Sequence, residues 1–123
     1  MLVTHGQVLL GGSTGGFAVL DAHTARSLPW PKNLIQKGNA GTGYGSAYAF
    51  ASSGDTIYLG ATSSAPFNRA GGRPANNLAS VVLPSGKFTN WRPDSGRCTS
   101  VGEIAVSGRE ILAGGRFSDT PCD

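Results

Sequence analysis

Tyr48–Pro93 reads YAFASSGDTIYLGATSSAPFNRAGGRPANNLASVVLPSGKFTNWRP. Short apolar runs alternate in this stretch with Gly, Ser, Pro and Asn, which favour turns. The pattern predicts four antiparallel strands, joined in order by a tight turn, a long loop and a second turn. The second strand ends in a glycine and the fourth in a tryptophan. This unit organises the chain, because parts of it recur on both sides.

The landmarks of the unit repeat along the chain. A glycine ends three short apolar runs, which are Val8–Gly12, Ile57–Ala61 and Ile111–Gly115. A turn signal with glycine precedes each run, as expected for tight hairpins, because glycine accepts the positive φ that they need. Phe17 to Trp30 and Leu78 to Trp91 are both steps of 13 residues. The repeated landmarks are Gly11, Gly12, Gly60, Gly114, Gly115, Trp30 and Trp91.

Four short antiparallel strands per repeat of about 50 residues are typical of a β-propeller blade. We therefore expect an all-β fold, an incomplete β-propeller of about two and a half four-stranded blades. The expected blades are residues 1–35, residues 46–93 and a half blade at residues 98–123. The two tryptophans are expected to pack between blades. An open β-sandwich with chance similarity between its strands is the alternative.

The expected arc is too short to close. Characterised propellers close with about four to eight blades, and an open arc leaves strand edges unpaired. Two explanations remain open: the chain is a fragment of a longer one, or other copies complete the ring. Three copies would supply roughly seven blades. We favour the fragment, since a lone strand pair is predicted at the C-terminus.

Composition and charge narrow the class of protein. Charged residues make up 14% of the chain and 19 of its 123 residues are glycine, which argues against a helical or disordered chain. The net charge is +3, with eight basic and two acidic residues from Arg26 to Arg97. The basic residues are scattered over several loops, so nucleic-acid binding is not expected. No stretch approaches the roughly 18 apolar residues of a membrane span.

The repeated motifs resemble those of kelch repeats. Val8–Gly12 supplies an apolar run with a double glycine, Asp21–Thr24 an Asp-x-x-Thr turn, and Trp30 the closing tryptophan. The later part is similar to the repeat propellers of bacterial extracellular proteins, which have Trp-x-Pro between blades and Gly-Gly-x-Phe after the second strand. Here these motifs are Trp91–Pro93 and Gly114–Phe117.

The resemblance covers nearly the whole chain, but its motifs specify a fold and not an activity. Blade two departs from it, since Gly60-Ala61 replaces the double glycine and residues 62–77 form a longer loop. Kelch-like repeats mostly serve binding, so the resemblance implies a binding role. An extracellular or cell-surface location is expected from the two cysteines and not from the resemblance.

Residues that could carry chemistry do not form a catalytic or metal-binding pattern. His5 and His23 have no second His or Cys at ligand spacing, so no metal is expected. Residues 11–15 match Gly-x-Ser-x-Gly, but a strand follows where a nucleophile elbow needs a helix. Residues 41–45 are rich in glycine, yet no helix follows to bind a phosphate. Asp21 is expected to accept hydrogen bonds from nearby backbone amides in a turn. No catalytic residue or cofactor is predicted.

Cys98 and Cys122 are the only two cysteines. Because strand direction alternates, the loop that follows the second strand of a blade emerges on the same face of the propeller as the connections between blades. Both cysteines fall on that face of the third blade, and we expect a disulfide between them. A disulfide implies an oxidising compartment. Two unrelated thiols are the alternative.

The same face carries the candidate binding site. Residues 31–45 and 62–77 are the two long loops on it, and recognition residues concentrate on such loops. The candidates are Lys32, Lys37, Tyr44, Phe67, Arg69, Arg73, Asn76 and Asn77. Aromatic, Arg and Asn side chains suit a polar partner, either protein or glycan. The loops would otherwise only cover blade edges.

Three functions follow as hypotheses. The first is a non-catalytic module for protein recognition or extracellular assembly. The second is a glycan-binding propeller, closed by oligomerisation or by missing blades. The third is the non-catalytic arc of a larger propeller enzyme.

Overall fold

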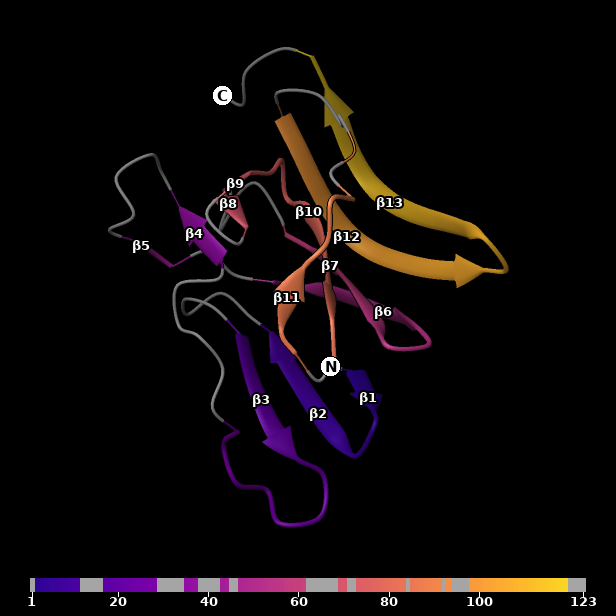
Figure 1. The fold of residues 1–123 in the computed structure, drawn as a ribbon. Coiled ribbons are helices and arrows are strands. Elements are labelled where there is room, and N and C mark those ends of the chain that lie inside the picture. The colour runs from indigo at the N-terminus through magenta and orange to yellow at the C-terminus, as the bar shows by residue number, and fades with distance from the viewer. Residues whose placement is uncertain are drawn as a thin grey trace.

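The computed structural model describes most of the chain. The described residues are 2–11, 17–28, 35–37, 43–44, 47–61, 69–70, 73–83, 85–91, 93 and 98–119. They form β-strands in four antiparallel sheets, and no described residue lies in a helix (Figure 1). The expected all-β class with antiparallel sheets is therefore confirmed.

The first sheet is a three-stranded meander. Its strands pair in the order β1 (Leu2–Thr4), β2 (Gln7–Gly11) and β3 (Phe17–Asp21). The four-stranded blade expected at residues 1–35 needs a fourth strand after β3, which would run from Ser27 to the closing Trp30. Ser27 forms an isolated bridge with Leu20, and Trp30 lies outside the described residues.

The second sheet contains the four strands that the central stretch predicts. They are β6 (Ala49–Ser53), β7 (Thr56–Gly60), β10 (Leu78–Val82) and β11 (Lys87–Phe88), paired in chain order. The third sheet is a hairpin of β12 (Cys98–Ser107) and β13 (Glu110–Ser118). A β-bulge between Val101 and Glu103 interrupts its register.

A fourth sheet lies where the sequence predicted loops. Its strands are β5 (Gly43–Tyr44), β4 (Ile35–Lys37), β8 (Arg69–Ala70) and β9 (Arg73–Pro74), in this order. The long loops at 31–45 and 62–77 therefore contain short strands. These strands have two or three residues each, too few to show an apolar alternation in the sequence.

The hairpin turns explain an irregular spacing in the repeat. The glycine in the turn precedes Gly11 by five residues but precedes Gly60 and Gly114 by six. The pairs Thr4–Gln7, Ser53–Thr56 and Ser107–Glu110 each enclose a two-residue turn. Glycine is the second turn residue in the first hairpin, where His5 also has a positive φ of 51°. In the other two hairpins glycine comes first. Gly11, Gly60 and Gly114 are therefore equivalent positions.

The first and second sheets pack face to face around one core. Leu9 and Val19 of the first sheet are buried against Ile57, Leu59 and Val81 of the second. Leu9, Ile57, Leu59 and Val81 have no exposed surface. Burial of this kind is the main favourable term in folding.

A second core joins the second and third sheets. Ala49 and Ala51 of β6 and Leu78 of β10 are buried against Val101 and Ile104 of β12. The first core uses the opposite side of the second sheet, because successive residues of a strand face opposite ways. The second sheet is thus covered on both faces, and the first strands β1, β6 and β12 are neighbours in succession (Figure 1).

Trp91 packs against the second core. It is partly buried there, and its ring centroid lies 5.0 Å from that of Tyr58 in an edge-to-face arrangement at 81°. Such aromatic pairs add about 0.5–1.5 kcal/mol beyond the burial of their area. Trp91 therefore contributes to packing between sheets.

Two glycines set how closely the sheets approach. A Cβ on Gly11 would lie 1.8 Å from the backbone oxygen of Ala47, at the edge of the second sheet. A Cβ on Gly60 would lie 2.6 Å from Cγ1 of Val101, in the third sheet. The equivalent Gly114 has no atom within 4 Å of such a Cβ. The sheets therefore pack closely only because Gly11 and Gly60 have no side chain.

We expect Gly60→Ala to destabilise the chain by about 1–3 kcal/mol, the usual cost of overpacking a core. Gly114→Ala is the matched control and should have almost no effect on the monomer, because its Cβ meets open space. Chemical denaturation of both variants measures the difference. Equal midpoints would contradict the close approach at Gly60.

Candidate binding face

The fourth sheet joins two connections that lie far apart in the sequence. β4 and β5 belong to the segment between the first and second sheets, and β8 and β9 to the segment inside the second sheet. Ile35 pairs with Ala70, and Gln36 pairs with Arg69. In Figure 1, β4 and β5 lie on the left, whereas the turns of hairpins β1–β2, β6–β7 and β12–β13 point to the right. The fourth sheet is thus at the end of the sheets opposite to the hairpin turns.

Strand pairing brings together the backbones of several candidate residues. Gln36 lies opposite Tyr44 on one side and Arg69 on the other. Lys37 lies opposite Gly43, and Arg73 opposite Ala70. Their grouping on one small sheet is a finding, whereas their role in binding stays a prediction. Lys32 and Phe67 lie outside the described residues.

Gln36 was not among the predicted site residues, although it occupies the centre of this group. No pattern in the sequence marks it, because Ile35-Gln36-Lys37 is one apolar residue followed by two polar ones and does not alternate as a strand would. Gln36 pairs with Arg69, which lies 33 positions further along the chain (69 − 36), so no local pattern in the sequence could indicate this pairing.

Asn77 is held inside the molecule, unlike its exposed neighbour Asn76. It is 7% exposed, and its Nδ2 donates to the backbone oxygen of Thr99 at 2.6 Å. Its own backbone oxygen accepts from the amide of Ala61 at 3.0 Å. The oxygen of Ala61 in turn accepts from the amide of Val101 at 2.8 Å. Asn77 therefore ties the end of the long loop to the third sheet.

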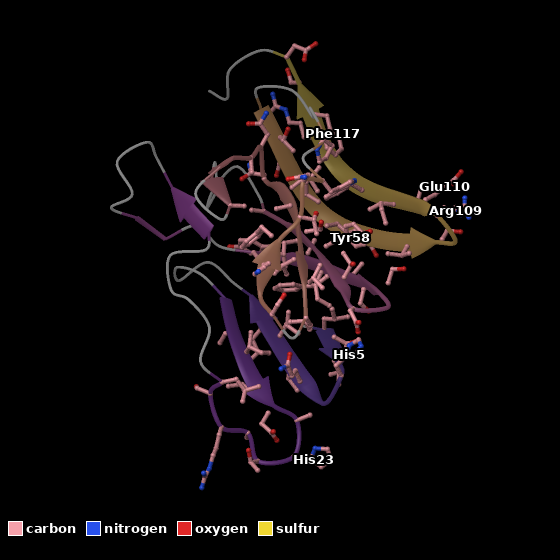
Figure 2. The ribbon with its side chains drawn as sticks, viewed as in Figure 1. His5, His23, Tyr58, Arg109, Glu110 and Phe117 are labelled. Carbon is pink, nitrogen blue, oxygen red and sulfur yellow. The ribbon has the colours of Figure 1, made fainter. Side chains whose placement is uncertain are left out.

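The two histidines lie at different turns and do not approach each other (Figure 2). His5 Nε2 contacts Oδ1 of Asp55 at 2.8 Å, which links the hairpin turns of the first and second sheets. Its Nδ1 is 2.8 Å from the Thr4 hydroxyl. Within the described residues no three His, Cys, Asp or Glu side chains form a group that could hold a metal ion.

Asp21 forms the turn that the sequence predicts. Its Oδ1 accepts hydrogen bonds from the amides of His23 at 2.8 Å and Thr24 at 2.9 Å. The bond from the Thr24 amide, followed by that from His23, lowers the pKa of Asp21 below its ordinary value of 3.8. Asp21 therefore has a structural role, as expected.

The predicted disulfide joins cysteines of which the structure describes only one backbone. Cys98 begins β12 and lies opposite Ser118. The side chain of Cys98 and the whole of Cys122 lie outside the described residues. The disulfide therefore stays a prediction.

Asn77→Ala should destabilise the chain by about 1–3 kcal/mol, because it removes the bond to Thr99 and places Ala at a φ of 58°. Asn77→Gly should cost less, since glycine adopts this φ without strain. Thermal or chemical denaturation distinguishes the two effects. If Asn76→Ala costs as much as Asn77→Ala, the anchoring role of Asn77 is wrong.

The stability that Asp21 provides should depend on pH. Its pKa is lower in the folded state than in the unfolded state, so the ionised form stabilises the fold above pH 3.8. This contribution is lost as the pH falls through the lower folded-state pKa. The difference in stability between the protein and Asp21→Ala should therefore be largest at pH 7 and should shrink as the pH falls below 3.8. A difference that is constant with pH would contradict this assignment.

Comparisons with known proteins do not identify a relative. No protein-family model, curated protein or solved structure matches the chain. None of the residues that the structure describes belongs to a helix long and apolar enough to cross a membrane. The function is therefore inferred from the residues and geometry described above.

Proposed function

We propose that this chain is an arc of a β-propeller and acts as a non-catalytic module that binds a protein partner through its fourth sheet. Support for the propeller comes from three sheets that stack in chain order, with β1, β6 and β12 as successive neighbours. Blades around a propeller axis follow one another in this way. The kelch-like motifs agree with this architecture.

The observation that carries the binding proposal is the pairing of β4 with β8. It holds two connections together at one end of the stacked sheets. Recognition residues concentrate on loops supported by a rigid scaffold. A loop fixed by strand pairing before binding loses less conformational entropy when a partner docks, which favours affinity.

The residue types at this sheet favour a protein partner with acidic groups. Lys37, Arg69 and Arg73 are cationic, and Tyr44 adds an aromatic ring. Arg and Tyr are enriched among the residues that dominate protein–protein affinity. Complementary charge also speeds association and selects the partner. An extracellular location would suit both this role and a disulfide at Cys98.

A charge-matched pair of variants tests the proposal. The first combines Lys37→Ala, Arg69→Ala and Arg73→Ala in the fourth sheet. The second combines Arg26→Ala, Lys87→Ala and Arg109→Ala, which removes as many charges from exposed positions outside the fourth sheet. We expect a protein partner cross-linked from an extract of the source cells to be recovered with wild type and with the second variant. Recovery with the first should fall at least about tenfold.

Two outcomes would contradict the proposal. Equal losses in both variants would show non-specific attraction to positive charge. Binding to a glycan array that the first variant abolishes, without any protein partner, would establish the glycan-binding alternative instead.

A further inference from the structure

The two contacts between sheets use equivalent positions of their second strands. In β2, Leu9 and Gly11 face the second sheet. In β7, Tyr58 and Gly60 face the third sheet. The register of the three hairpins makes Leu112 the equivalent residue in β13, with Gly114 two positions further along.

The equivalent positions of the third sheet are uncovered among the described residues. Leu9 has no exposed surface, whereas Leu112 is 55% exposed. No atom lies within 4 Å of a Cβ placed on Gly114. A Cβ placed on Gly60, in contrast, would lie 2.6 Å from Cγ1 of Val101. Ala105 lies opposite Leu112 in β12 and is also exposed. We call Ala105, Leu112 and Gly114 the leading face.

The first sheet exposes the complementary half of the same contact. Its residues Val3, Val8 and Leu10 face away from the second sheet, because they alternate with Leu2 and Leu9, which pack against that sheet. Val3 is 60% exposed and Leu10 is 37% exposed. We call Val3, Val8 and Leu10 the trailing face.

The second sheet shows what a trailing face does when it is covered. Ile57 and Leu59 are the equivalents of Val8 and Leu10, and both are fully buried in the first core. The large apolar residues that the described chain exposes are Val3, Leu10, Leu112 and Phe117. All except Phe117 belong to the leading or the trailing face. Each chain thus carries both halves of a contact that it already makes twice internally.

We propose that the leading face of one copy of this chain docks onto the trailing face of a second copy, in the same head-to-tail sense as its internal sheets. This inference rests on the proposed function only in that it extends the same propeller arc. A second copy fits because its trailing face has the same construction as the faces that cover Leu9 and Tyr58. Glu103 and Glu110 are exposed on the leading side of the third sheet and suit a polar rim. Contacts of this kind join different surfaces, so they build rings or open filaments.

Complementary variants test the direction of the contact. Leu112→Asp disables the leading face and Leu10→Asp the trailing face. Each variant alone should sediment as a 12.6 kDa monomer, while the wild type forms larger species. A mixture should form a 1:1 dimer and nothing larger, because one leading face and one trailing face remain intact. Phe117→Asp is the matched control on the other side of β13 and should self-associate like the wild type.

Circular dichroism checks that each variant is folded. If Leu112→Asp does not fold, Ala105→Glu replaces it on the leading face, and if Leu10→Asp does not fold, Val3→Asp replaces it on the trailing face. A wild type that stays monomeric at several hundred micromolar, or a mixture that stays monomeric, would overturn the inference. The partner-binding assay with the fourth-sheet variants separates the two proposals. A monomer that retains its partner refutes only the self-association, and an assembly without a partner refutes only the proposed function.

Discussion

The fold depends on the absence of side chains at two points where one sheet meets the next. Gly11 lies against the backbone of Ala47, and Gly60 lies against Val101. Because the sheets come this close, the larger residues around them can interdigitate in two continuous cores. A single strand position, used once per sheet, therefore sets the spacing of the whole stack. The same position in β13 is where the stack ends among the described residues.

The second sheet could be predicted from the sequence because its signals are local. Each strand is an apolar run bounded by a turn, and the strands pair in chain order. The fourth sheet could not be predicted, because β4 and β8 pair across a large separation and are too short to show periodicity. Turn residues such as Gly and Pro around them also favour a loop interpretation.

The candidate site was predictable as a face but not residue by residue. Alternation of strand direction indicates that the two long connections emerge at the same end, and β4 and β8 do pair there. The sequence alone makes Asn76 and Asn77 equal candidates for binding. Only the structure separates them, because the positive φ of Asn77 turns its amide toward Thr99. Gln36 was missed since no motif marks it.

The hydrogen bonds at Ala61 and Asn77 have a consequence for how this chain can change. The amide of Ala61 donates a hydrogen bond to the backbone oxygen of Asn77. This bond holds the two ends of the long connection together where β7 ends and β10 begins. Lengthening a closed loop costs little free energy once its ends are fixed, about 0.6 kcal/mol per doubling. Insertions between these two residues should therefore leave the stacked sheets intact. The hydrogen bond makes this connection a natural place to graft foreign peptides.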